Sequence, residues 1–194
     1  MKNLLHLHTG PIETNTYLFA CGDAWAVVDP GGDTSNILKL AGNKPISFVL
    51  LTHAHWDHTG AVADLQAKGA KVYLHEKEAP NASASHRVFG KVAPDILIKD
   101  GDVLDLNGVA VTVMHTPGHS AGSVCYLVED IIFSGDTLFK GEIGRCDLPS
   151  SDYGIMKNTL RKLFAIEKDY RVLAGHGDES TLLYEKKHNP YATV

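Results

Sequence analysis

The sequence predicts a mixed α/β domain in which strands and helices alternate along all 194 residues. Short apolar and β-branched runs occur in both halves of the chain, and helix-like segments follow them. Strands followed by helices suit two sheets packed face to face with helices outside. Periodicity alone leaves α/β and α+β both open. The length favours a single domain over 1–194, with enough chain for a sizeable core.

The first half is expected to contain five strands, predicted from its apolar runs: 4–7, 17–20, 25–28, 46–51 and 72–74. Helices are predicted between them over 34–40 and 61–68, where apolar side chains recur at helical spacing. Thr34 or Ser35 is expected to cap the first of these helices. Gly69 is expected to end the second.

The second half is expected to repeat this organisation, with strands at 103–104, 109–114, 124–128, 131–133 and, as the last strand, 172–173. Asn107-Gly108 between the first two predicts a two-residue hairpin turn. Two helices are predicted over 151–166 and 181–188. Ser151 or Asp152 is expected to start the longer one. Its expected inward side chains are Ile155, Leu160, Leu163 and Phe164.

Composition narrows the class of protein. A net charge of −5 argues against general nucleic-acid binding. No apolar run is long enough to span a bilayer, and residues 1–8 lack the continuous apolar stretch of a signal peptide. The three cysteines are odd in number and form no C-x-x-C pair, which suits a reducing compartment. We therefore expect a cytoplasmic protein, and the sequence leaves its oligomeric state open.

The most informative segment of the chain holds three imidazoles and one carboxylate within the six residues from His53 to His58. Alternate side chains of an extended segment share a face, so His53 and His55 can converge on one point. A turn would aim Asp57 and His58 at a neighbouring point. Zinc and iron(II) accept this mixture of nitrogen and oxygen donors. The segment therefore predicts a metal site, against the alternative of a polar loop that is merely rich in histidine.

Three further donors stand at turn-like positions in the second half: His119, Asp136 and His176. Each follows a short apolar or β-branched segment, so each is expected at a strand end. Strand ends and the loops beyond them are where a rigid scaffold displays reactive groups. Glycines beside these donors allow the backbone to approach a site closely. We expect these residues to complete the metal site.

In this arrangement of donors the chain resembles the metallo-β-lactamase superfamily, whose signature is H-x-H-x-D-H followed by a separate His, Asp and His. The resemblance covers nearly the whole chain, and the segments 10–17 and 28–32 look like the family's opening strands. Segment 141–148 resembles the glyoxalase II-like branch, and 180–191 resembles its small single-domain members. The resemblance implies a four-layer αββα sandwich.

The resemblance also implies two adjacent divalent metal ions. The ligands it implies are His53, His55 and His119 for the first ion, Asp57, His58 and His176 for the second, and Asp136 as a bridge. Asp57 and Asp136 would act in catalysis together with a metal-bound hydroxide, since two cations that share a water lower its pKa. Imidazole and carboxylate suit zinc, iron and manganese alike, and zinc is the first expectation.

The activity implied is hydrolysis of a small-molecule acyl thioester such as S-lactoylglutathione, as in hydroxyacylglutathione hydrolases. A thiolate leaves readily because a free thiol has a pKa of about 8.5, so no separate general acid is essential. Two alternatives stay open: a persulfide dioxygenase with one iron held by His53, His119 and Asp136, and a hydrolase of lactones or other esters. A non-catalytic metal-binding domain is least expected, because the ligand set is intact.

Three residues are expected to support the site. Arg145 is expected to bind the substrate, with an ion pair to Asp147 as the equal alternative. Asp29 and His115 are expected to orient ligand imidazoles. The alternatives are that Asp29 stabilises the turn after its strand and that His115 has a plain structural role. Only residues 177–194 follow the last donor, so we expect no separate C-terminal helical domain of the kind that binds glutathione in the larger glyoxalase II enzymes.

Overall fold

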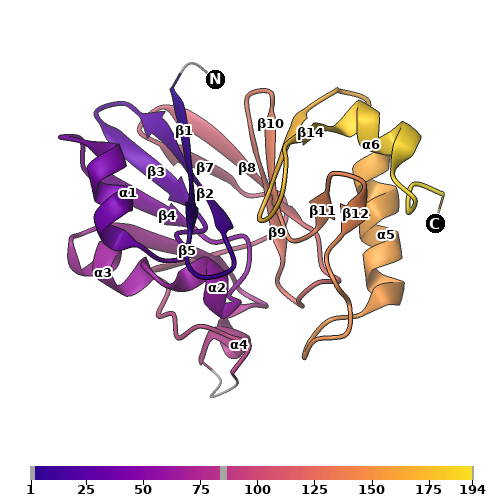
Figure 1. Ribbon diagram of the computed structural model, residues 1–194, viewed down its shortest axis with the longest axis horizontal. Coiled ribbons are helices and arrows are strands. Elements are labelled where there is room, and N and C mark those ends of the chain that lie inside the picture. The colour runs from indigo at the N-terminus through magenta and orange to yellow at the C-terminus, as the bar shows by residue number, and fades with distance from the viewer. Residues whose placement is uncertain (1–2, 84–86, 194) are drawn as a thin grey trace.

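A computed structural model describes residues 3–83 and 87–193 of the chain. Two six-stranded sheets face one another between outer layers of helices, which confirms the four-layer αββα sandwich (Figure 1). The first sheet has the spatial order β1 (Leu4–Thr9), β2 (Thr14–Cys21), β3 (Ala24–Val28), β4 (Ile46–Leu50), β5 (Lys71–His75), β6 (Ile96–Ile98). The second has the order β14 (Ser180–Thr181), β13 (Arg171–Ala174), β10 (Ile131–Gly135), β9 (Val124–Val128), β8 (Val109–His115), β7 (Val103–Leu106).

Helices and a small hairpin complete the fold: α1 (Thr34–Ala41), α2 (Trp56–Thr59), α3 (Val62–Ala67), α4 (Ala79–Ser83), α5 (Tyr153–Phe164), α6 (Leu182–His188), β11 (Leu138–Phe139) and β12 (Glu142–Ile143). Figure 1 shows α1 and α3 outside the first sheet and α5 and α6 outside the second. Strands β3 to β6 are parallel, and β10 pairs with β13 in parallel through the α5 crossover. None of the helices in the described ranges has the length and apolar character needed to cross a membrane.

Three apolar clusters hold the layers together. The central one lies between the sheets, where the rings of Phe19 and Phe133 stack with centroids 5.6 Å apart. The outer clusters seat α1 on the first sheet through Ile37 and α5 on the second through Leu160. Burial of such side chains contributes on the order of 1.5–3 kcal/mol each, so the sandwich is a rigid base for the loops at its edge.

The predicted hairpin is confirmed, because Asn107 and Gly108 both adopt positive φ (51° and 87°) between β7 and β8. This is the type I′ geometry that matches the twist of the flanking strands. The predicted cap of α1 is wrong. Asp33 precedes the helix in a left-handed conformation (φ 53°) and makes no side-chain cap bond. Its carboxylate instead accepts a hydrogen bond from the amide of Gly10 (3.0 Å), which ties the β1–β2 turn to the helix start.

Helix α5 begins as expected, because the Asp152 side chain accepts a hydrogen bond from the amide of Ile155 (2.9 Å). The predicted burial of Ile155 is wrong, since its side chain is 45% exposed and Met156 is buried in its place. The burial of Leu160 and Leu163 is confirmed, and Phe164 is partly buried against the same cluster, so the prediction fails only in the first turn of the helix. The short strand β14 pairs with β13, so 172–173 is not the last strand. Its residues, Ser180 and Thr181, are polar and carry no strand periodicity.

Candidate metal centre

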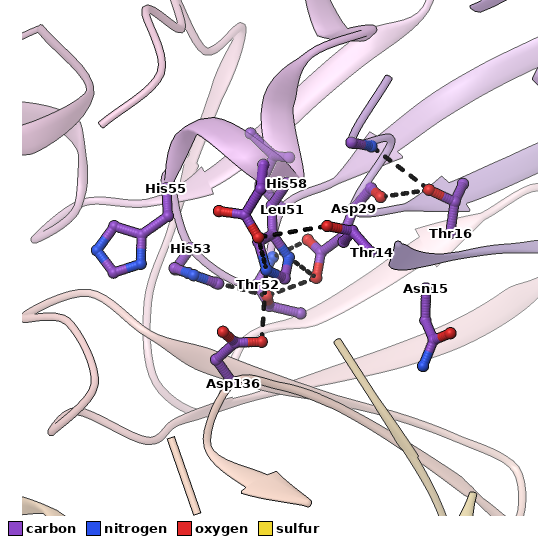
Figure 2. A network of polar contacts seen from close by, with 12 residues as sticks. Thr14, Asn15, Thr16, Asp29, Leu51, Thr52, His53, His55, His58 and Asp136 are labelled. Carbon is purple, nitrogen blue, oxygen red and sulfur yellow. Dashed lines mark hydrogen bonds and ion pairs between the residues drawn. The ribbon is translucent and has the colours of Figure 1, made fainter. Parts of the chain in front are cut away.

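All seven predicted donors come together at one edge of the sandwich, although they arise from both sheets. The segment from the end of β4 into α2 supplies the first four: His53, His55, Asp57 and His58. The second sheet supplies three: His119 from the β8–β9 loop, Asp136 directly after β10, and His176 shortly after β13. In Figure 2, Asp136 reaches toward His58 and His53 from the opposite side of the group. Five of the seven residues are buried, and the side chains of Asp136 and His176 are 11% and 27% exposed.

The strand ends explain how the donors approach so closely. The pairing of β10 with β13 shifts register between Phe133 and Gly135, and such an irregularity re-aims the chain that follows. Asp136 is the next residue. A side chain at Gly175 would place its Cβ 2.3 Å from Asp136 Oδ1 and 2.6 Å from His58 Cε1. Only glycine leaves room there for the two donors to meet.

The first donor group consists of His53, His55 and His119. One ligand atom from each lies within 4.8 Å of the others. His55 Nδ1 is 2.9 Å from His119 Nε2. The Nε2 atoms of His53 and His55 are buried and have no hydrogen-bond partner among the described residues. Buried imidazole nitrogens without a partner are costly, so they indicate a group that is held there.

The second donor group consists of Asp57, His58 and His176, which also place ligand atoms within 4.8 Å of one another. Asp57 Oδ2 lies 3.1 Å from the Nε2 atom of each imidazole. Thr14 in β2 donates a hydrogen bond to the same carboxylate oxygen (3.3 Å). The carboxylate therefore has one oxygen in contact with both imidazoles.

Asp136 lies between the two groups. Its Oδ1 is 3.4 Å from His58 Nε2 of the second group, and its Oδ2 is 3.5 Å from His119 Nε2 of the first. Oδ2 also lies 3.8 Å from His176 Nε2. A carboxylate can bind two cations at once, which neutral imidazole cannot do, because its oxygens carry several lone pairs. The position of Asp136 is thus suited to a bridge.

Asp29 controls the orientation of two donor imidazoles (Figure 2). Its carboxylate accepts hydrogen bonds from the amide of Thr52 (2.8 Å) and from the Thr52 hydroxyl (2.6 Å). Since that hydroxyl proton is used, Thr52 Oγ1 accepts a hydrogen bond from His53 Nδ1 at 3.0 Å. His53 Nε2 is then left with a free lone pair. Asp29 Oδ2 also lies 3.0 Å from His58 Nδ1, so Asp29 occupies the place expected for it.

Backbone groups hold the donors of the second sheet. His119 Nδ1 donates to the carbonyl oxygen of Arg145 (2.9 Å), which leaves its Nε2 lone pair facing the other donors. The side-chain amide of Asn15 donates to the carbonyls of Ala174 (3.0 Å) and Gly177 (2.9 Å) on either side of His176. Asn15 is not among the supporting residues expected from the sequence. Its signal is a buried polar start to an otherwise apolar strand, at residues 14–16.

Burial and neighbouring charged groups shift the pKa values of the donors in different directions. Burial, together with the neighbouring imidazoles, lowers the pKa of His53 well below its usual value and that of His55 to about 3. Burial alone would also lower the pKa of His58, but the carboxylates of Asp136 and Asp29 outweigh it and raise that pKa well above its ordinary value. The pKa of Asp57 is lowered despite burial, because His176 and His58 contact its carboxylate.

Neutral imidazoles and charged carboxylates are the forms that bind metal, so the pKa shifts of His53, His55 and Asp57 favour binding, whereas His58 would release its proton to a bound cation. The partnerless buried nitrogens, the oriented tautomers and the mixed nitrogen and oxygen donors therefore fit divalent cations such as zinc, iron or manganese. The described residues include three combinations of donors that could hold an ion, and all three fall within this centre. The third combination uses Asp29, whose oxygens are already engaged by Thr52.

Two expected supporting residues have other contacts. Arg145 pairs with Asp147 through two hydrogen bonds (2.6 and 2.8 Å), which is the alternative that the sequence left open. His115 bonds to the carbonyl of Ala121 (3.0 Å) and stacks on His75 with ring centroids 4.2 Å apart. In the part of the chain that the structure describes, no recorded contact joins His115 to one of the seven donors.

A cleft of about 750 Å³ opens onto the donors. His55, Asp57 and Asp136 form part of its floor. Apolar side chains form much of its wall: Ile12, Trp56, Val88, Phe139, Ile143 and Leu148. The charged groups at its wall are Glu142 and Arg145. A cleft of this size accommodates a small-molecule ligand.

Several known proteins are similar to this chain in sequence and in fold. The family profile of the metallo-beta-lactamase superfamily matches residues 9–176. A probable metallo-hydrolase of Bacillus subtilis, YqgX, is 37% identical over 94% of this chain and 93% of its own length. The hydroxyacylglutathione hydrolase GloC of Haemophilus influenzae is 32% identical over 86% of each chain.

Among solved structures, the B3 metallo-beta-lactamase BLEG-1 superposes with a TM-score of 0.89 at 32% identity, over 99% of this chain and 100% of its own. The protein TTHA1623, solved in a di-iron-bound form, gives a TM-score of 0.87 at 34% identity, over 96% and 99%. The profile match extends over all seven donors that the structure gathers at the sheet edge. The chain belongs to the metallo-beta-lactamase superfamily.

Proposed function

We propose that this protein is a metal-dependent hydrolase that cleaves a small acyl thioester, with S-lactoylglutathione as the leading candidate. The observation that supports this most strongly is the position of Asp136, whose carboxylate contacts imidazoles of both donor groups. The names of two relatives support a metal-dependent hydrolase, because one is a probable metallo-hydrolase and another a hydroxyacylglutathione hydrolase.

The proposed ligand sets follow the two donor groups. One ion would be held by His53, His55 and His119, the other by Asp57, His58 and His176, and Asp136 would bridge them. Divalent cations bound in this way lower the pKa of water and polarise a carbonyl oxygen. Zinc is the first choice from the donor set, and iron is supported by the di-iron form of a neighbouring structure.

The chain's own residues would prepare the centre and the cleft. Asp29 and the Arg145 carbonyl keep the imidazoles of His58 and His119 in the orientation that leaves Nε2 free. The apolar walls of the cleft would keep water away from the acyl group. The thiol leaving group needs no proton donor at neutral pH, since its pKa is about 8.5. Arg145 stands at the cleft wall, where it could exchange Asp147 for a carboxylate of the substrate.

A substrate panel tests the proposal. Protein loaded with zinc, and separately with iron, is assayed against S-lactoylglutathione, a neutral acyl thioester, a homoserine lactone and glutathione persulfide under oxygen. We expect thiol release from the thioesters and two ions per chain by elemental analysis. Lactone opening without thioester cleavage would redirect the proposal to ester hydrolysis. Oxygen uptake with the persulfide, and no hydrolysis, would replace it with a dioxygenase.

We also propose that the enzyme works in the cytoplasm. Cys21, Cys125 and Cys146 are all free thiols, and the first two are buried. Free cysteines persist where the compartment is reducing. Cell fractionation followed by immunodetection checks this, and recovery with exported proteins would contradict it.

A further inference from the structure

Glu78 carries a fully buried carboxylate that is separate from the seven donors. It lies between β5 and α4, and four groups donate hydrogen bonds to it. Oε1 accepts from the amide of Ala54 (3.2 Å). Oε2 accepts from the hydroxyl of Ser120 (2.9 Å), the amide of Gly122 (2.8 Å) and the side-chain amide of Asn81 (3.4 Å). All four partners are donors, so the site matches an ionised carboxylate.

Three of these partners, Ala54, Ser120 and Gly122, belong to the two loops of the first donor group, and the fourth, Asn81, lies in α4. Ala54 stands between His53 and His55, and Ser120 directly follows His119. The first loop extends from the first sheet and the second loop connects two strands of the second sheet. The carboxylate of Glu78 therefore links the two segments that must hold their imidazoles at a fixed spacing.

The packing around Glu78 is adapted to this link. A side chain at Gly122 would place its Cβ 2.3 Å from the Glu78 amide nitrogen and 2.4 Å from its Cβ, so the second loop can approach only because this residue is glycine. A second bridge between the loops lies nearby, from the amide of Val124 to the carbonyl of Thr52 (2.9 Å). Glu78 adds side-chain hydrogen bonds to both loops, which this backbone bridge does not supply.

A buried carboxylate costs free energy unless it is fully hydrogen-bonded, and an apolar side chain would fill the space at lower cost. We infer that Glu78 is a positioning residue that sets the spacing between the His53–His55 loop and the His119 loop for the first metal ion. Among the described residues, the hydrogen bonds of its carboxylate go to Ala54, Asn81, Ser120 and Gly122, and to none of the seven donors. The inference rests on the proposed metal centre.

The test is Glu78→Gln in the full chain. The glutamine has nearly the same shape, but its NH₂ group must face either the Ala54 amide or the Gly122 amide, where a donor would meet a donor. Release of Zn²⁺ from the loaded protein to a chromophoric chelator is followed without substrate. The wild type should release two ions. We expect the variant to bind one ion about tenfold more weakly and the other ion with unchanged affinity. Tenfold is the lower end of the loss in metal affinity that is typical when a residue that orients a ligand is replaced.

Glu185→Gln is the matched control. Glu185 is equally buried and accepts hydrogen bonds from the Gly141 amide (2.9 Å), the Asn189 side chain (2.8 Å) and the Ser180 hydroxyl. In the described part of the chain, none of these hydrogen bonds reaches either loop of the first group. The same substitution there should lower the melting temperature and leave the release of both ions unchanged. If Glu78→Gln does not fold, Ser120→Ala removes one donor alone and should weaken the same ion a few-fold.

The outcomes separate the two proposals. Wild-type protein that fails to hold two ions would refute the metal centre, and the role of Glu78 with it. Wild-type protein that holds two ions, with unchanged affinities in both Glu78→Gln and Ser120→Ala, would overturn the role of Glu78 alone. Equal weakening of both ions in Glu78→Gln and Glu185→Gln would also overturn it, because it would indicate a general loss of stability.

Discussion

Replacing Asp29 by asparagine should reverse the hydrogen bonds that orient two donor imidazoles. Asp29 is 2% exposed and accepts from both the amide and the hydroxyl of Thr52. An asparagine would keep its oxygen toward the Thr52 amide and turn its NH₂ toward the hydroxyl. The hydroxyl would then accept, and its own proton would point to His53 Nδ1. His53 would carry its proton on Nε2, the atom that the first ion needs.

The magnitude follows from the number of imidazoles affected. The relay through Thr52 reaches His53 of the first donor group at 3.0 Å, and Asp29 Oδ2 reaches His58 of the second at 3.0 Å. Loss of such an orienting contact typically costs about 10- to 100-fold in metal affinity. This corresponds to about 1.4–2.7 kcal/mol for each ion. Since each donor group loses one contact, Asp29→Asn should weaken both ions by this amount.

Zinc affinities measured by chelator competition, with the same samples assayed for thioester hydrolysis, check this prediction. Thr52→Val is the matched control, because it removes the relay and leaves Asp29 beside His58. We expect that variant to weaken one ion only. Wild-type affinity for both ions in Asp29→Asn would refute the argument about the tautomers. Equal weakening of both ions in Thr52→Val would show that the two groups do not bind independently.

Four further predictions follow from the site and its surroundings. Asp136→Asn should lower kcat/KM by more than about 100-fold and reduce bound metal, measured by kinetics and elemental analysis; full activity would exclude Asp136 as the bridge. Gly175→Ala places a Cβ 2.3 Å from Asp136 Oδ1, so it should destabilise the chain by about 1–3 kcal/mol in urea unfolding and lower metal content. Arg145→Ala should raise KM for anionic thioesters about two- to fivefold and leave neutral ones unchanged; equal effects would assign Arg145 to its pair with Asp147. Burial lowers the pKa of His75 to about 4, so the unfolded chain takes up this proton near pH 6.5 and the folded chain only near pH 4. Stability should therefore fall by up to about 3 kcal/mol as the pH drops through that window, and His75→Gln should remove this component in urea titrations at pH 7 and pH 5.

The donors could be predicted from the sequence because four of them fall within the six residues from His53 to His58. His119 and Asp136 each follow a short apolar or β-branched segment, and the order of the whole set resembles a family signature. The alternating apolar segments predicted the strands and helices, and the resemblance supplied the four-layer arrangement of two sheets. Both kinds of inference use patterns that are local to a short stretch of chain.

The supporting roles of Asn15 and Glu78 could not be predicted, because each depends on hydrogen bonds to residues that are distant in the sequence. Asn15 holds a carbonyl 162 residues away, and Glu78 accepts from an amide 44 residues away. Nothing near them in the chain marks these contacts. The burial of Ile155 was predicted wrongly for a related reason, since Ile155 and Met156 are both apolar and only the packing against the second sheet decides which one is buried.

The origin of the donors in two separate sheets has a consequence for how the protein resists unfolding. An ion held by His55 and His119, or by His58 and His176, is a cross-link between the two halves of the chain, comparable to a disulfide that closes a long loop. An ion that binds only the folded chain adds about 2.7 kcal/mol of stability when its free concentration is 100 times its dissociation constant. Chelation should therefore remove this cross-link and its stabilisation, while the apolar cluster between the sheets still holds the two halves together.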